Sequence, residues 1–178
     1  GGVGVTTPAL GFLLDRGIDL VFLSATGAFR GRLGGDLGRH LDLRRAQYRR
    51  ADDPAFCLGV ARAVVGGKIR NCRTLAMRLD ETNAEPVASR GAATLRALLD
   101  EAAVAPDRQA LLGIEGRAAR AHFGVLRRYL RPPWAFPRRA RRPPPDPVNA
   151  LLSLLYTLLH EGCVAALAAV GLDPACGV

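Results

Sequence analysis

The class of fold is decided by the stretch PAFCLGVARAVVGGKIRNCRTLAMRL, residues 54–79. Its apolar residues recur every three or four positions, which is the period of an α-helix with one buried face. The adjacent glycines Gly66 and Gly67 are the point at which we expect this helix to kink. The arginines that this spacing places on the other face are Arg62, Arg70, Arg73 and Arg78.

Helical patterns continue on both sides of this stretch. A basic helix starts near residue 41 and is expected to close at Asp53-Pro54, because proline does not continue a helix. An amphipathic helix is predicted over 91–104. Pro106 is expected to open the next helix, which runs to about Leu130.

A proline-rich segment separates these helices from the last apolar part of the chain. Residues 131–147 hold seven of the twelve prolines, so no helix passes through them. Asp146 and Pro147 are residue types favoured at the N-cap and at the first position of a helix. The final helices are therefore expected to fill 148–170.

The first 38 residues have a different pattern. A short helix over 10–16 is expected to end at Gly17, in the manner of a C-cap glycine. The run IDLVFLS, 18–24, is rich in β-branched and aromatic residues and is typical of a buried strand. A second short strand is expected within 26–33, before the glycines of 34–38 break the pattern.

These patterns predict an α+β protein. Residues 1–38 are expected to be the C-terminal part of a small β-strand domain, because two short strands do not make an independent sheet. Residues 39–178 are expected to form a mainly α-helical domain. The only methionine is Met77, which also indicates that the chain begins inside a longer protein.

The charge balance points to a polyanionic partner. Basic residues outnumber acidic ones 25 to 16, the formal net charge is +9, and Lys68 is the only lysine. A sequence pI near 10.6 favours nucleic acid as the partner, with an anionic membrane surface as the second choice. The four cysteines form no C-x-x-C pair, so we expect reduced thiols of a cytoplasmic protein and no structural zinc site.

The most apolar stretch, residues 149–172, is long enough to span a bilayer. His160, Glu161 and Gly162 interrupt it at the centre, where charge is unfavourable in a membrane. We therefore expect buried helices of a soluble core rather than a membrane span.

An arginine-rich segment carries the strongest binding signal. Seven arginines lie between Arg127 and Arg142, with Trp134 and Phe136 among them. Guanidinium groups neutralise phosphates, and aromatic rings stack on unpaired bases. The alternative is a solvated loop whose two aromatic residues anchor it to the core. Two further basic stretches, 44–50 and 62–78, favour contact with nucleic acid.

One carboxylate, Glu115, has no obvious purpose. It lies in LLGIEGRAARAHF, residues 111–123, and no residue three or four positions away on its own helix is basic. It is interpreted either as an acid near a helix N-terminus, where the macrodipole favours it, or as a ligand of Mg²⁺ or Mn²⁺. The residues alone leave both interpretations open.

Five stretches in order resemble one family across nearly the whole chain. The chain is similar to the CRISPR-associated integrase, the Cas-one endonuclease of the adaptation complex. The stretches are GVTTPALGFLLDRGIDLVFLSATGAFRGRL, ARAVVGGKIRNCRTL, LLGIEGRAARAHF, RRARRPPPDPVNALLSLLYTLL and AAVGLDPACG. The resemblance implies a small N-terminal β domain, a larger α-helical catalytic domain, and a homodimer that assembles with a small partner, Cas-two.

The resemblance also implies an activity and a site. Members of the family join the 3′-hydroxyl ends of short DNA to CRISPR repeat DNA by metal-dependent transesterification, and some cut DNA. Of the three metal ligands of the family, a Glu, a His and an Asp, only the first maps here, onto Glu115. The His motif would begin at Gly177 and Val178, so its His and the Asp are expected beyond Val178. Two smaller departures are Cys72 in place of a common Gln and His122 in place of a common Tyr.

We therefore predict a fragment, lacking both ends, of a cytoplasmic metal-dependent DNA endonuclease and integrase that uses Mg²⁺ or Mn²⁺. As a fragment it is expected to be inactive, with Glu115 as its catalytic and metal-binding residue. The expected partners are spacer DNA and CRISPR repeat DNA, and no association with a membrane is expected. One alternative is a non-catalytic, arginine-rich helical DNA-binding module, and another is a structural piece whose apolar surface is covered by other segments. The candidate DNA-binding residues are Arg62, Lys68, Arg70, Arg78, Arg138, Arg139, Arg141 and Arg142.

Overall fold

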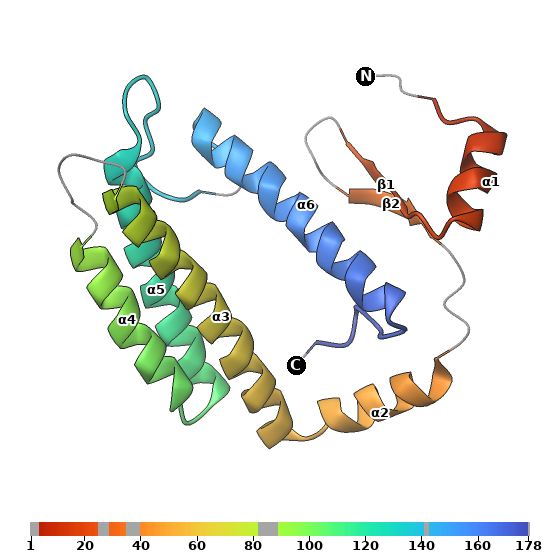
Figure 1. Cartoon of the computed structure of the whole chain (residues 1–178), viewed down its shortest axis with the longest axis horizontal. Coiled ribbons are helices and arrows are strands. Elements are labelled where there is room, and N and C mark those ends of the chain that lie inside the picture. Colours follow the sequence, from red (N-terminus) through yellow and green to blue (C-terminus); the bar gives the residue numbers. More distant parts are fainter. Residues whose placement is uncertain (1–3, 25–28, 35–39, 82–88, 141–142, 178) are drawn as a thin grey trace. The chain divides into compact units, whose positions relative to one another are not determined.

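A computed structural model describes residues 4–24, 29–34, 40–81, 89–140 and 143–177 (Figure 1). The chain divides into two compact units, one of Gly1–Arg49 with Ala150–Gly177 and one of Arg50–Asn149. The elements in chain order are α1 (Thr7–Asp15), β1 (Leu20–Leu23), β2 (Phe29–Leu33), α2 (Leu41–Ala51), α3 (Pro54–Glu81), α4 (Ser89–Ala103), α5 (Arg108–Tyr129) and α6 (Pro147–Ala169).

Helix α1 begins at Thr7, earlier than the apolar pattern predicts, because Thr6 caps it. The Thr6 hydroxyl accepts a hydrogen bond from the Ala9 backbone N–H at 3.4 Å. The helix ends as expected at Gly17, whose φ of 65° lies in the left-handed region that glycine adopts without strain. The Ile18 N–H then bonds back to the Leu13 carbonyl at 2.9 Å, which closes the last turn.

The two strands form an antiparallel hairpin in which Leu20 lies opposite Leu33. An ion pair of 2.6 Å between Arg32 and Asp19 ties its open end. The prediction of a buried strand was wrong: the residues of β1 are half-buried, and the Phe22 side chain is 45% exposed. A two-stranded sheet cannot bury its faces by itself, and the sequence pattern reports only the residue types.

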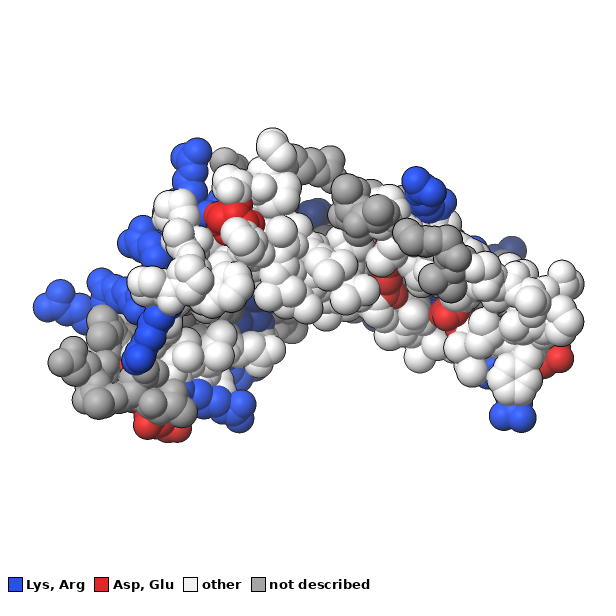
Figure 2. Space-filling view, turned by 90° about the horizontal axis from the view of Figure 1, so that it is seen from above, with Lys and Arg blue, Asp and Glu red and all other residues white. Residues whose placement is uncertain are grey.

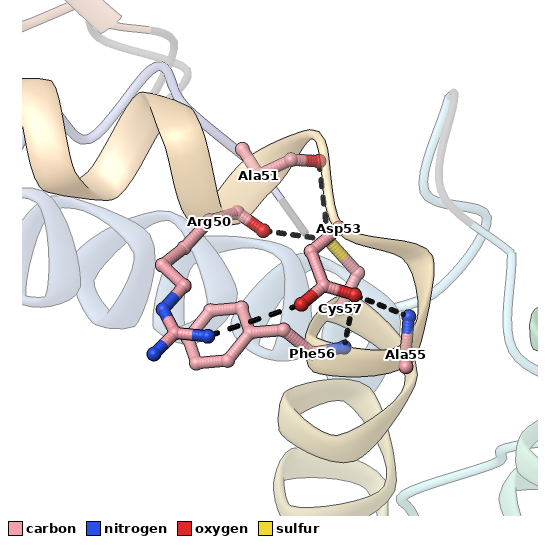
Figure 3. Close-up of polar contacts among 6 residues, drawn as sticks. All are labelled: Arg50, Ala51, Asp53, Ala55, Phe56 and Cys57. Atoms are coloured by element: carbon pink, nitrogen blue, oxygen red, sulfur yellow. Dashed lines mark hydrogen bonds and ion pairs between the residues drawn. The ribbon is translucent and has the colours of Figure 1, made fainter.

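Asp53 lies in the turn between the end of α2 and the start of α3 (Figure 3). Its carboxylate accepts hydrogen bonds from the backbone N–H groups of Ala55 and Phe56 at 3.0 and 3.2 Å, so it caps the start of α3. The buried Cys57 thiol donates to the carbonyl of Ala51 at 3.3 Å. The structure thus confirms that Asp53-Pro54 separates two helices.

Helices α3, α4 and α5 pack together as an up-down-up bundle, which Figure 1 shows with α3 and α5 running in the same direction. The Tyr129 hydroxyl of α5 donates to the Asp80 carboxylate of α3 near the C-terminal ends of both helices. Each fully buried large aliphatic side chain stabilises the bundle by about 1.5–3 kcal/mol. The buried residues of this core are Ile69, Ala76, Leu95, Leu98, Ala102, Ala105, Leu111, Ile114, Ala118 and Val125.

Both glycines of α3 lie inside one continuous helix, 54–81. Gly66 is buried, and a Cβ placed on it would lie 3.7 Å from Leu99 of α4. An alanine at this position would make only an ordinary van der Waals contact with Leu99, so the packing of α4 against α3 does not depend on the glycine.

Helix α6 is one helix of 23 residues where the sequence predicted more than one. Asp146 caps it as expected, because its carboxylate accepts from the Asn149 N–H at 2.7 Å. By length and composition α6 could cross a membrane, and only 6% of its most apolar window is buried. The expectation of buried helices was therefore wrong for this chain: Leu151, Leu155 and Leu159 are each at least half exposed.

The C-terminal end of α6 is fixed to α2. Gln47 donates to the Asp173 carbonyl at 2.9 Å and accepts from the Asp173 N–H at 2.8 Å. The Tyr48 hydroxyl donates to the Asp173 carboxylate at 2.6 Å, which raises the pKa of Tyr48 and lowers the pKa of Asp173. These three hydrogen bonds hold the turn Asp173-Pro174, which follows α6, against α2.

A Gly91→Ala substitution is expected to destabilise the bundle. A Cβ at Gly91 of α4 would lie 2.3 Å from the Val125 side chain of α5, which is buried and cannot move aside freely. Overpacking of this kind lowers the free energy of unfolding by about 1–3 kcal/mol. Urea unfolding measures the change.

The matched control is Gly59→Ala in α3, where nothing lies within 4 Å of the added Cβ. That substitution is expected to stabilise the helix by roughly 0.5–1 kcal/mol. Equal effects of the two substitutions would contradict the close approach of α4 to α5.

Candidate functional site

The central feature of the bundle surface is an ion pair between Lys68 of α3 and Glu115 of α5. The buried neighbours of the two residues, Ile69 and Ile114, belong to the same core and bring the two helices together at this level. The Glu115 side chain is 27% exposed and that of Lys68 is 46% exposed. The pair therefore lies at the surface, where solvent and ligands reach it.

The interpretation of Glu115 changes in two ways. No basic residue on its own helix pairs with it, but a lysine on the neighbouring helix does. In addition, α5 begins at Arg108, with Asp107 as its N-cap, so Glu115 is the eighth residue of the helix. The macrodipole interpretation was therefore wrong, because that effect fades within the first turn.

Two further polar side chains share this region. Cys72 follows Lys68 by one turn of α3, and burial raises the pKa of its thiol, although the Lys68 charge opposes the rise. His122 follows Glu115 by two turns of α5, and burial lowers the pKa of its imidazole, with the Lys68 charge adding to the fall. At neutral pH these shifts favour an uncharged thiol and an uncharged imidazole beside the ion pair.

The side chains at this site do not by themselves fit a divalent metal ion. Within the part of the chain that the structure describes, no three or more His, Cys, Asp and Glu side chains come together. The one carboxylate at the site, Glu115, already has a cationic partner. A resident Mg²⁺ or Mn²⁺ prefers several oxygen ligands, so this chain offers part of a site at most.

Arg62 and Arg139, two of the predicted DNA-binding residues, have partners inside their own unit. Arg62 is half-buried, and its Nε donates to the Ala105 carbonyl at 3.0 Å, just after the C-terminal end of α4. Arg139 donates to the side-chain carbonyl of Asn149 at 3.0 Å. Both arginines therefore support the fold, in addition to any part they take in binding.

The other candidate residues differ in their exposure. Arg70, Arg78 and Arg138 are exposed, and Figure 2 shows basic side chains protruding over the part of the molecule that contains the bundle. Lys68 is partly exposed in its pair with Glu115. Arg141 and Arg142 lie outside the described residues.

Asn149 organises the arginine-rich segment and was missed in the sequence. It is fully buried. Its amide donates to the Arg138 carbonyl at 2.9 Å and to the Asp146 carboxylate at 2.7 Å, and its carbonyl oxygen accepts from the Ala140 N–H at 2.8 Å. The only signal in the sequence is its position three residues after a helix N-cap.

The two aromatic residues of this segment have different roles. Phe136 is buried and packs against Phe123 of α5 with ring centroids 5.9 Å apart, so it anchors the segment. Trp134 is 54% exposed and borders a cavity of about 480 Å³ that Arg127 also lines. The structure thus combines the two interpretations: one ring anchors the loop, and the other is accessible for stacking.

Together these features describe a basic helical protein with exposed arginines and a partly exposed carboxylate, Glu115, on the surface of its bundle, which is the class of a protein that acts on nucleic acid. The comparisons with known proteins give the family. The family model described as CRISPR associated protein Cas1 matches residues 1–178. The chain belongs to this family.

Curated relatives support the assignment. The chain is 39% identical over 188 residues to a protein of Rhodospirillum rubrum named CRISPR-associated endonuclease Cas1 2, covering 99% of the chain and 54% of the relative. It is 42% identical to a Geobacter sulfurreducens protein named CRISPR-associated exonuclease Cas4/endonuclease Cas1 fusion, covering 98% of the chain and 33% of the relative. The chain thus spans about half of the first relative and a third of the second.

Solved structures have the same fold. A Cas6-RT-Cas1–Cas2 complex matches with a TM-score of 0.75 and 28% identity, over 94% of this chain and 18% of that one. A casposase bound to integration product matches with a TM-score of 0.75 at 20% identity, over 96% of this chain and 47% of that one. The second likeness is one of fold alone.

An Asn149→Ala substitution is expected to release the arginine-rich segment. It leaves the Ala140 N–H and the Arg138 carbonyl without their buried partner, and each such loss destabilises by about 1–3 kcal/mol. Limited trypsin digestion followed by mass spectrometry should then show faster cleavage after Arg138 and Arg139. The matched control is Asn71→Ala at an exposed position of α3, which should leave the rate of cleavage unchanged. Equal rates in the two variants would contradict the anchoring role.

Proposed function

We propose that this chain is part of an enzyme of CRISPR spacer acquisition. The enzyme joins the 3′-hydroxyl ends of short DNA to CRISPR repeat DNA by transesterification and has DNA endonuclease activity. The match of the Cas1 family model to the whole chain carries this proposal. Two relatives whose names contain the word endonuclease support it.

In this proposal the exposed arginines bind the DNA backbone. Contacts of arginine with phosphate position a duplex without reading its sequence, which suits an enzyme that takes up DNA of many sequences. Arg70 of α3 and Arg138 of the arginine-rich segment are exposed and suit this role. Trp134 stacks on an unpaired base at an end of the DNA.

Glu115 is proposed as the catalytic carboxylate and as one ligand of Mg²⁺ or Mn²⁺ in the longer protein. Glu115 would hold the ion through its carboxylate, and the ion, when bound, would supply Lewis-acid stabilisation of charge on phosphate oxygens. The described residues supply a single carboxylate at this place. The remaining ligands of the ion would therefore come from other residues. We propose that the 178-residue chain is therefore inactive on its own.

The proposed assembly is a cytoplasmic homodimer bound to Cas2. A solved complex that contains Cas1 and Cas2 matches this chain at 28% identity, which supports the partner. The free thiols of the four cysteines agree with a reducing compartment.

A second candidate function is a non-catalytic DNA-binding module. The observation that favours it is the ion pair itself, since Glu115 is already neutralised by Lys68. In that case the arginines alone carry the function, and Glu115 serves only to hold α3 against α5.

The proposal is tested by Glu115→Gln in the complete protein that contains these residues. We expect DNA binding within about twofold of wild type, because a surface ion pair contributes about 0–1 kcal/mol and the arginines are unchanged. We expect the rate of half-site integration with Mn²⁺ to fall by about a hundredfold or more, since an essential charge is lost. Gel assays of strand joining measure the rate.

The control is Glu101→Gln, which removes a carboxylate that also pairs with a basic residue of α5, Arg117. It should leave integration unchanged. Full integration activity in Glu115→Gln would reject the catalytic role and favour the binding module.

The role of the arginines is tested by the salt dependence of binding. Each lost phosphate contact reduces the slope of log K against log salt by about 0.9 for duplex DNA. We expect this change for Arg70→Gln and for Arg138→Gln. The control is Arg96→Gln on α4, where the arginine is exposed and pairs with Asp100 of its own helix. An unchanged slope in both test variants would show that DNA binds elsewhere.

A further inference from the structure

We propose that Arg73 of α3 is a phosphate-binding residue, and that with its neighbour Arg70 it holds the DNA backbone on the α4 side of the bundle. This side of α3 is different from the one that carries the pair of Lys68 and Glu115. The inference rests on the proposed function, since DNA is the source of the phosphate. The spacing in the sequence places Arg73 on the polar face of its helix, whereas the structure shows it half-buried.

Arg73 lies on the side of α3 that packs against α4. Gly66 comes two turns earlier, and a Cβ placed on it would lie 3.7 Å from Leu99 of α4. Seven residues turn a helix by about 700°, so position 73 faces nearly the same way as Gly66. Because α4 runs back alongside α3 (Figure 1), seven residues back from Leu99 gives Ala92, whose small side chain leaves room for the arginine stem. Lys68, which pairs with α5, lies about 140° away round the helix.

The guanidinium of Arg73 is a partly buried charge without a partner. Its Nε is buried, and no acceptor binds it among the residues that the structure describes. Within the same residues, no ion pair involves Arg73. Buried polar groups in native proteins almost always have a hydrogen-bond partner, and one that has none calls for a water molecule or an ion. Arg73 therefore needs an acceptor that the described residues do not supply.

The carboxylates of the bundle are already used by other side chains. Their ion pairs join Lys68 to Glu115, Arg96 to Asp100 and Arg117 to Glu101. Asp80 accepts a hydrogen bond from the Tyr129 hydroxyl. The charge of Arg73 is thus left for a partner from elsewhere, and the formal net charge of +9 favours a polyanionic one.

The way in which Arg73 is held suits a phosphate. Its Nε is covered while the residue as a whole is half-buried, so the side chain is fixed at its stem and the rest of the guanidinium reaches the surface. An arginine fixed in this way loses little side-chain freedom on binding, and its planar fork matches two oxygens of a phosphate. Partial burial also reduces screening by water, which strengthens the attraction to an anion.

Arg70 extends the site along the same side of α3. Residues three positions apart on a helix are neighbours, with Cβ atoms about 5–6 Å apart. The Arg70 side chain is exposed and forms no ion pair with any of the described residues. Two neighbouring cations without counter-ions match a chain of phosphates, whose own counter-ions are released on binding. The site therefore contacts the backbone of DNA and reads no base sequence.

The test is the binding of a short DNA duplex to the complete protein at several salt concentrations. We expect Arg73→Gln to bind about tenfold more weakly, because a hydrogen bond to a charged group is lost. The slope of log K against log salt should fall in magnitude by about 0.9. Arg73→Lys keeps the charge but not the planar fork, so its slope should be unchanged and its affinity should fall less than in Arg73→Gln.

The matched control is Arg117→Gln, which removes one positive charge where α5 pairs with α4 through Glu101. It should leave the affinity and the slope unchanged. An equal loss in Arg117→Gln and Arg73→Gln would show a general effect of net charge and would overturn the site.

Thermal unfolding of the DNA-free protein separates binding from support of the fold. Because Nε of Arg73 has no acceptor among the described residues, Arg73→Gln should melt at or above the temperature of wild type. Weaker DNA binding without a lower melting temperature supports the site. Weaker binding with a melting temperature lower by several degrees shows a structural role and overturns it.

The same measurements separate failure of this inference from failure of the proposed function. Wild-type binding by Arg73→Gln, together with weaker binding by Arg138→Gln, overturns the site and leaves the proposed function intact. A wild-type protein that binds no DNA rejects both.

A second measurement follows the guanidinium directly. The rate at which a dicarbonyl reagent modifies Arg73, read from its peptide by mass spectrometry, should fall when DNA saturates the wild-type protein. The rate at Arg117 should not change. A rate at Arg73 that saturating DNA leaves unchanged would show that no phosphate covers the residue, which overturns the site.

Discussion

The packing of α3 against α5 in the same direction is the constraint on which the candidate site depends. These helices are separated in sequence by α4, which runs back between them and fills the core with Leu95 and Leu98. Only this return places position 68 beside position 115. The candidate site is thus a product of three-helix packing, since neither helix alone brings a base to the acidic residue.

Much of the local structure could be predicted from the sequence because its causes are local. Gly17 ends α1, Asp53 starts α3 and Asp146 starts α6, each through a backbone conformation or a hydrogen bond within a few residues. The long helix over 54–79 follows from the spacing of its apolar residues. The family could be recognised for the same reason, since its motifs are short runs of sequence in a fixed order.

The features that could not be predicted all involve partners distant in sequence. Helical periodicity compares Glu115 with residues on its own helix, so it cannot reveal Lys68. Nothing in the sequence around Arg62 indicates that its guanidinium reaches the Ala105 carbonyl. The apolar composition of α6 likewise does not indicate that the helix is largely exposed. Patterns of residue types identify which face of a helix is apolar, but what covers that face is decided by packing.

Two polar contacts join α3 and α5 at different levels of the bundle: Lys68 with Glu115, and Asp80 with Tyr129. They are separated by about 18 Å along α3 and about 21 Å along α5, at 1.5 Å per residue. Side chains can absorb that small difference in length, but they cannot absorb a rotation. Inserting or deleting one residue between the two contacts turns the rest of the helix by about 100° and swings one partner off the shared face. Between these contacts the length of each helix is therefore fixed, and changes in chain length are expected to be tolerated only in the connecting segments.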